Sequence, residues 1–158
     1  MLITVYFLVK KYFDSEEKKR QIQQVLKNQE IITPLRLQAY ERIILFLERI
    51  SPENLILRIN KPGFTNKQLQ TELLNSIRTE FDHNISQQLY VSIDAWEMVK
   101  NAKSNIIHLI NSTSEKFKAE EPSLNLSMAI LEITMKQPQL LTLETINYIK
   151  EEMKTLVG

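Results

Sequence analysis

The sequence contains no cysteine and only two glycines, Gly63 and Gly158. Without cysteine there is no disulfide, no thiolate nucleophile and no zinc site of the cysteine type. Without a glycine-rich loop, backbone amides cannot cradle a phosphate as the common nucleotide-binding folds require. These absences exclude several large classes of enzyme, and the lack of cysteine is compatible with a reducing compartment.

The chain also has no excess of charge of either sign, since it contains 20 basic and 19 acidic residues. A balanced chain has no overall field to attract a polyanion, so nucleic acid is not expected as a partner. The length of 158 residues suits one domain, and a chain of this size can bury a core without a metal or a disulfide.

The chain opens with the apolar stretch MLITVYFLV, which Lys10 and Lys11 follow. Nine residues rise only about 13 Å as a helix, against roughly 30 Å of membrane hydrocarbon, so this stretch cannot span. A signal peptide is not indicated, because the basic residues follow the apolar stretch instead of preceding it. We interpret residues 1–30 as a truncated membrane anchor and a charged stalk helix, with Tyr6, Lys10, Lys11 and Tyr12 near the lipid headgroups. The alternative is a short amphipathic lead-in that packs on the domain or on a neighbour.

Residues 31–158 are predicted to form an all-α domain of about five or six packed helices. Thr33 and Pro34 indicate a helix start, because proline at the first helical position loses no bonded amide. Ser51, Pro52 and Glu53 repeat this signal, and capping signals at Thr65 and Ser92 indicate two more starts. The expected helices, after a solvated stalk at 14–32, are 34–50, 52–58, 65–90, 92–113, 124–135 and 142–156.

Two of these helices raise questions of packing. Apolar residues recur in steps of four between 69 and 89, so the stripe winds about 200° around one straight helix. Either that helix has partners on more than one side, or it bends near Asp82 and restarts at Asn84. The stretch LNLSMAILEITM at 124–135 is apolar nearly all round and is interpreted as a buried helix that Pro138 ends. Thr142 then caps the last helix, on which Glu152 is expected to face outward.

The helix at 34–50 carries the sharpest candidate for an interaction surface. Its core face is expected to comprise Leu37, Tyr40, Ile43, Ile44, Leu47 and Ile50. The opposite arc holds Glu41, Arg42, Glu48 and Arg49 around Leu45. Glutamate and arginine each recur at a spacing of seven around an exposed leucine, which is typical of a helix that docks on another helix. The alternative is a solvated charged face on which one leucine is exposed.

Glu80 and His83 form an E-x-x-H pair, with a carboxylate and an imidazole one turn apart. Di-iron bundle proteins need this pair twice and a further glutamate from each of two other helices. The second copy is missing, because Asn105 stands three residues before the other histidine, His108. No strand-turn-helix elbow is present for a serine nucleophile either. We therefore expect no catalytic site, no metal and no cofactor.

Three stretches are similar to a family of uncharacterised proteins from Bacteroidota: ITPLRLQAYERIILFLERISPENLILR, EFDHNISQQLYVS and AWEMVKNAKSNIIHLIN. The resemblance covers roughly residues 31–112. It implies a complete N-terminal membrane segment that ends in a lysine pair, and it implies no reaction, cofactor or partner. The start of this chain departs from that pattern, because its apolar stretch is short.

These observations predict a membrane-tethered protein-interaction or scaffold domain that acts through a protein partner or self-association. We expect it on the cytoplasmic face of the inner membrane if the anchor is complete, and otherwise in the cytoplasm. Two alternatives come from other classes. One is a metal-binding or enzymatic bundle that uses Glu80 and His83, and the other is a module that binds anionic lipid through Lys10 to Arg20.

Overall fold

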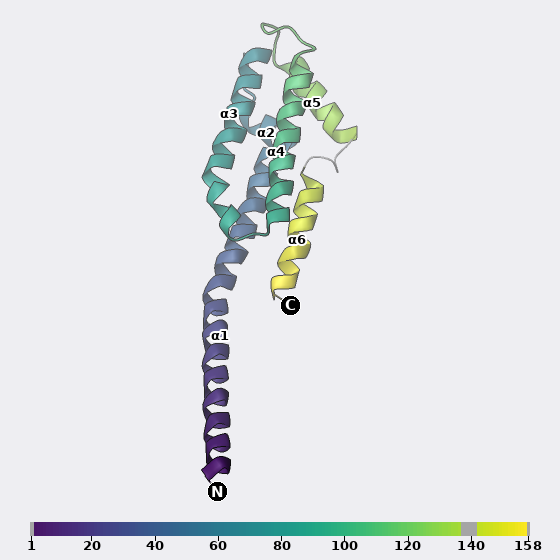
Figure 1. Cartoon of the computed structure of the whole chain (residues 1–158). Helices are drawn as coiled ribbons and strands as arrows, with labels where there is room; N and C mark the ends of the chain where they lie inside the picture. Colours follow the sequence, from purple (N-terminus) through teal and green to yellow (C-terminus); the bar gives the residue numbers. More distant parts are fainter. Residues whose placement is uncertain (1, 137–141, 158) are drawn as a thin grey trace. The chain divides into compact units, whose positions relative to one another are not determined.

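The structure is a computed structural model that describes residues 2–136 and 142–157 (Figure 1). Six α-helices and one 3₁₀ helix lie in these ranges: α1 (Leu2–Ile50), α2 (Pro52–Ile59), α3 (Asn66–Asn84), η1 (Ile85–Leu89), α4 (Ile93–Ser114), α5 (Leu124–Lys136) and α6 (Leu143–Val157). The expected all-α class is confirmed. An isolated antiparallel bridge joins Thr65 to Pro122 in the turns.

Contacts divide the chain into two compact units, residues 1–36 and residues 37–158. In the first unit, no side chain that the structure describes is buried. Ile22, Val25 and Leu26, the thin apolar stripe of the stalk, are each more than half exposed. Among the described residues, no helix combines the length and the apolar character that crossing a membrane requires.

The helix start expected at Thr33 and Pro34 is wrong, because α1 continues through Pro34 to Ile50. Proline removes one backbone donor from a helix and crowds the carbonyl four residues earlier, yet it leaves the other hydrogen bonds intact. A helix can therefore continue through a proline. A proline in the sequence can mark either the first residue of a helix or a position inside one, and the sequence alone does not distinguish the two.

The second unit has one hydrophobic core, to which α1 contributes more of the large, fully buried side chains than any other helix. α3 and α4 run side by side in opposite directions, and α6 packs against α4 (Figure 1). From residues 37–50 of α1, the side chains of Ala39, Tyr40, Ile43, Phe46, Leu47 and Ile50 are buried. Leu73 and Ile77 of α3 and Ile106 of α4 are fully buried in the same core. The core face that the sequence predicted for 34–50 is confirmed, except that Leu37 and Ile44 are only partly buried and Phe46 joins it.

The capping signals at Thr65 and Ser92 are confirmed. The Thr65 hydroxyl accepts a hydrogen bond from the Gln68 amide at 3.2 Å, and the Gln68 side chain accepts one from the Thr65 amide at 2.9 Å. The Ser92 hydroxyl accepts from the Ala95 amide at 3.0 Å. Gly63 has φ +86° in the turn between α2 and α3, a conformation that residues with a Cβ rarely adopt.

The question of one helix or two between residues 65 and 90 is resolved. The α-helix ends at Asn84 and a 3₁₀ helix follows. Leu69, Leu73 and Ile77 are buried, whereas Ile85 and Leu89 are exposed. The winding stripe therefore does not need partners on several sides, because its last part faces outward.

The expectation that the helix at 124–135 is buried all round is wrong. Its inner face, with Leu126 and Ile130, is buried, but Leu124, Met128 and Met135 are exposed by 61%, 60% and 76%. Pattern alone cannot tell which faces of an apolar helix find a covering partner. The expected stop at Pro138 lies outside the described residues.

Candidate functional site

Glu80 of the E-x-x-H pair takes part in a network of ion pairs within the chain. The carboxylate of Glu80 accepts hydrogen bonds from Arg49 Nε at 2.8 Å and Nη2 at 2.5 Å. Arg58 Nη1 reaches the same Glu80 oxygen at 3.3 Å. Through these contacts Glu80 joins α1, α2 and α3, and Arg58 also donates to the Arg49 carbonyl at 3.3 Å.

The charges of this network explain the pKa of Glu80. Partial burial raises the pKa of its carboxyl, but the hydrogen bond and charge of Arg49, helped by the charge of Arg58, lower it by more. The pKa of Glu80 therefore lies below its usual value, and that of Arg49 is raised by its hydrogen bond to Glu80. Within residues 2–136 and 142–157, no three metal-ligating side chains of the His, Asp or Glu type come together. The sequence alternative of a metal centre at Glu80 and His83 therefore has no supporting ligand cluster in the part of the chain described.

The five positions of the predicted interaction face, Glu41, Arg42, Leu45, Glu48 and Arg49, are all exposed. Leu45 is 54% exposed at the centre of this face. Arg49 pairs with Glu80, and Arg42 Nη2 donates to the carbonyl of His83 at 3.4 Å. We call these five residues the α1 face.

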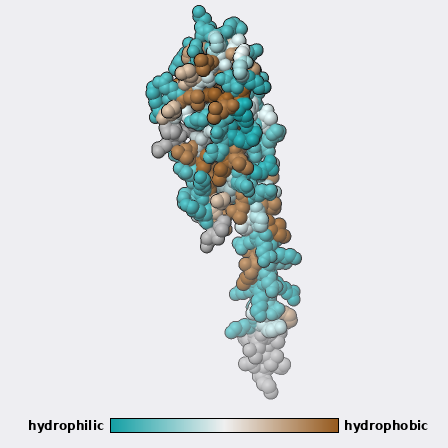
Figure 2. Space-filling model, turned by 180° about the vertical axis from the view of Figure 1, so that it is seen from behind, coloured by the Kyte–Doolittle hydropathy of each residue, from teal (hydrophilic) through white to brown (hydrophobic). Residues whose placement is uncertain are grey.

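A second exposed surface is the outer side of α5, which the sequence did not identify. Apolar residues recur along this side at spacings of four, three and four, which is typical of a helix that pairs with another helix. They are Leu124, Met128, Leu131 and Met135. A hollow of about 550 Å³ is lined by three of them, Met128, Leu131 and Met135, together with Phe117 and Glu132. We call these four residues the α5 seam. In Figure 2, apolar side chains form separate patches on an otherwise hydrophilic surface.

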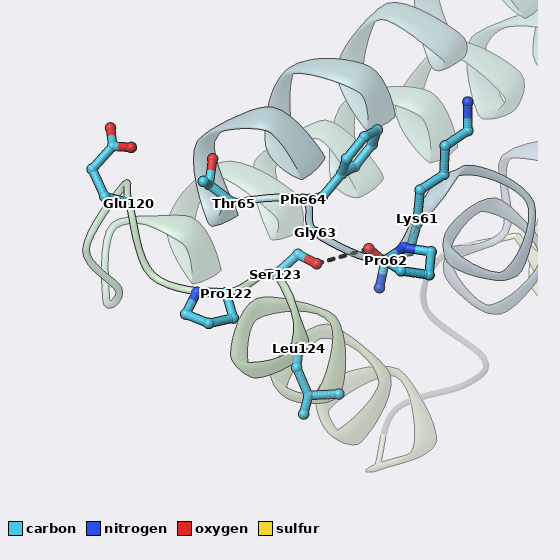
Figure 3. Close-up of a pocket in the computed structure, with 10 residues that line it drawn as sticks. Lys61, Pro62, Gly63, Phe64, Thr65, Glu120, Pro122, Ser123 and Leu124 are labelled. Carbon is cyan, nitrogen blue, oxygen red and sulfur yellow. Dashed lines mark hydrogen bonds between the residues drawn. The ribbon is translucent and has the colours of Figure 1, made fainter.

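A second hollow, of about 490 Å³, lies where the turn after α2 meets the turn before α5 (Figure 3). Its polar groups already bind one another: the Ser123 hydroxyl donates to the Asn60 side chain at 2.8 Å, and the Ser123 amide donates to the Phe64 carbonyl at 2.9 Å. The Asn66 amide donates to the Glu121 carbonyl at 2.8 Å. These hydrogen bonds hold the two turns together.

Trp96, near the start of α4, belongs to a cluster of aromatic rings. Trp96 stacks on Phe81 with ring centroids 5.5 Å apart, and Phe81 meets Phe46 at 5.9 Å. The Lys103 ammonium lies 3.7 Å from the centre of the Phe81 ring. These contacts join α1, α3 and α4, whereas Tyr90 lies at the surface.

The residue that sequence reasoning missed is Glu152, which was expected to face outward. It is partly buried, and its carboxylate accepts hydrogen bonds from the hydroxyl of Tyr40 and from the hydroxyl of Ser92, the latter at 2.6 Å. The Ser92 amide donates to it as well, at 3.2 Å. The sequence gives one indication of this contact, which is the tyrosine at a core position of α1. A buried tyrosine hydroxyl needs a hydrogen-bond partner.

The predicted membrane-proximal residues lie on the first unit. The side chains of Tyr6, Lys10, Lys11 and Tyr12 are exposed. The rings of Tyr12 and Phe13 meet edge to face at 6.1 Å. Aromatic and cationic side chains thus share this end of α1.

A family model matches residues 1–156, and its description is a family of unknown function (DUF7935). The chain belongs to this family. No curated protein and no solved structure matches it. The resemblance to an uncharacterised family, which the sequence of residues 31–112 indicates, is therefore confirmed. The match to DUF7935 covers nearly the whole chain. Membership of DUF7935 carries no statement about an activity or a membrane anchor.

Proposed function

We propose that this protein is a membrane-tethered interaction domain on the cytoplasmic face, and that its α5 seam binds an amphipathic helix of a partner protein. The observation that carries the proposal is the exposure of three apolar side chains of the α5 seam, Leu124, Met128 and Met135, at helix-pairing spacing beside the partly buried Leu131. Exposed apolar side chains that gather in this way mark interaction sites more often than scattered ones do.

The chemistry of the α5 seam favours a helix as the partner. α5 has 13 residues and is therefore about 20 Å long, which matches three to four turns of a docked helix. Methionine has three rotatable bonds and a polarisable sulfur, so Met128 and Met135 can adapt to a partner's side chains. A few exposed side chains on one helix fall short of the roughly 800 Å² per partner that a standard interface of two globular proteins buries. An amphipathic helix laid along the hollow beside Phe117 fits this scale.

Photo-crosslinking in native membranes tests the docking site. A photoreactive phenylalanine analogue is placed at Met128, at Met135 or, as a control, at the exposed Ser104 of α4. The proposal expects one common crosslinked protein from the two seam positions and not from Ser104. The substitution Met128→Glu should abolish this product when the probe is at position 135, whereas Leu45→Glu, on the α1 face, should leave it. Identical products from all three probe positions would contradict the proposal.

The tether is proposed from the first residues of α1. Tyr6 and Tyr12 are amphipathic rings that suit the headgroup region, and Lys10 and Lys11 lie between them. Each lysine near an anionic surface contributes roughly 1 kcal/mol, and salt screens this attraction. The purified chain should therefore sediment with phosphatidylserine vesicles at low salt and be released by high salt. Lys10→Glu with Lys11→Glu should lose this binding, whereas Lys100→Glu with Lys103→Glu should not. Equal binding by the two double variants would refute the tether.

A further inference from the structure

We infer that the α1 face is a contact between two copies of this chain, in which residues 37–50 of α1 from each copy run parallel to each other. The inference concerns a different helix from the α5 seam and does not depend on the function proposed for it. It follows from how four charges are placed around Leu45.

The charges are sorted by sign across the α1 face. At 100° per residue, Glu41 and Glu48 lie about 40° and 60° to one side of Leu45, and Arg42 and Arg49 lie about 60° and 40° to the other. One edge of the face is therefore acidic and the other is basic, with an exposed leucine between them. A helix surface that is merely solvated has no need of this separation.

The contacts within the chain do not neutralise either edge. Glu41 and Glu48 make no ion pair with any residue that the structure describes. On the basic edge, Arg49 and Arg58 share the single carboxylate of Glu80. This group of three side chains therefore keeps a net charge of one positive unit. Among the described residues, Arg42 donates to a backbone carbonyl alone, at 3.4 Å, and no carboxylate pairs with it. The two edges thus carry opposite charges that a partner can pair.

The partner with the matching pattern is a second copy in parallel orientation. A two-fold axis parallel to the helices brings the acidic edge of each copy against the basic edge of the other, at the same level along the helix. Glu41 then meets Arg42 of the other copy, Glu48 meets Arg49, and the two Leu45 side chains pack together. An antiparallel pair instead sets glutamates against glutamates and arginines against arginines, which is unfavourable.

Sedimentation equilibrium of the purified full chain measures the contact. The wild type is expected to be a monomer–dimer mixture that shifts toward dimer with concentration. Leu45→Glu should weaken dimerisation by about a hundredfold, because it removes a buried leucine from both sides of the contact. Met128→Glu, an equivalent change on the α5 seam, should leave the dimer unchanged. A wild type that stays monomeric at every concentration, or a Leu45→Glu variant with unaltered mass, would overturn the inference.

A second experiment reverses charges on the α1 face, and it tests the dimer even if the Leu45→Glu variant folds poorly. Glu41→Arg with Glu48→Arg makes both edges basic, and Arg42→Glu weakens the basic edge, so each of these chains alone should be monomeric. When the two are mixed, three of the four charge pairs between the copies are again opposite in sign, and a heterodimer should form. Failure of the mixture to associate, with both chains folded by circular dichroism, would also overturn the inference.

Disulfide formation between introduced cysteines shows whether the two copies are parallel. The chain has no cysteine of its own, so only the introduced residue can form the disulfide. Gln38 is exposed one heptad before Leu45, near the centre line of the same face. In a parallel pair the two copies of Gln38→Cys lie opposite each other and should crosslink on mild oxidation. The control Ser104→Cys on α4 should not. Crosslinking of Gln38→Cys no faster than that of Ser104→Cys would exclude the parallel arrangement.

Discussion

Glu152 on α6 accepts a hydrogen bond of 2.6 Å from the hydroxyl of Ser92, the residue that caps the first turn of α4. The same carboxylate accepts from the hydroxyl of Tyr40, a fully buried residue of α1. A negative charge beside the start of a helix is favoured by the helix dipole. One side chain therefore joins three helices and satisfies a buried donor.

Loss of this carboxylate should destabilise the second unit. Glu152→Ala removes the hydrogen bond that the buried Tyr40 hydroxyl donates to this carboxylate, and losing a buried hydrogen bond of this kind costs about 1–3 kcal/mol. The matched control is Glu151→Ala, which removes an exposed pair with Lys154 at 2.6 Å and should change stability by at most about 0.5 kcal/mol. Urea unfolding followed by the fluorescence of Trp96 measures both variants. Equal effects of the two substitutions would show that the contact with Tyr40 contributes nothing.

The position of Glu152 illustrates what the sequence could predict and what it could not. The caps at Thr65 and Ser92 are interactions between residues three apart, so the sequence contains the whole signal. The contact between Tyr40 and Glu152 joins residues 112 apart, and an acidic residue on an amphipathic helix resembles a solvated one. The exposed side of α5 was missed for a related reason, because composition shows that a face is apolar but not whether another element covers it. The five exposed positions around Leu45 were predicted, since burial follows the helical period along one helix.

The ion pairs of Glu80 should make stability depend on pH. Because the pKa of Glu80 is lowered on folding, its contribution is fully present above the pKa of the unfolded chain. It is lost as the pH falls through the lower, folded pKa. Glu80→Gln should therefore reduce stability at pH 7, and the difference from the wild type should shrink as the pH falls below about 4.3.

The size of this effect is limited, because Arg49 is 54% exposed and water screens the pair. We expect about 1 kcal/mol or less at pH 7. Glu132→Gln is the control, since the pKa of Glu132 is also lowered by its hydrogen bond to Lys136, but the pair is fully on the surface. Urea unfolding at a series of pH values compares the three chains. A Glu80→Gln variant whose deficit stays constant from pH 7 to pH 3 would contradict the assignment.

Pro34 lies inside α1, so its replacement should strengthen the helix. Pro34→Ala restores a backbone donor and removes the crowding of the preceding turn, which together are worth up to about 3 kcal/mol in a helix interior. Hydrogen exchange should slow for amides on both sides of position 34. The variant Gln29→Ala, at a site without such a defect, should change exchange much less. Faster exchange around residue 34 in Pro34→Ala would indicate that a break at the proline is the favoured state.

The two compact units should unfold separately. No described side chain of residues 1–36 is buried, and isolated helices are marginal in water because their stability comes mainly from a packed apolar face. Residues 37–158 share one core that includes Trp96, the single tryptophan of the chain. Trp96 fluorescence should therefore report one cooperative transition, whereas far-ultraviolet circular dichroism, which records helix in both units, should begin to decrease at lower urea concentration. A chain that begins at Leu37 should keep the fluorescence transition and lose the early decrease. Coincident transitions by both probes in the full chain would mean instead that residues 1–36 are stabilised together with the core.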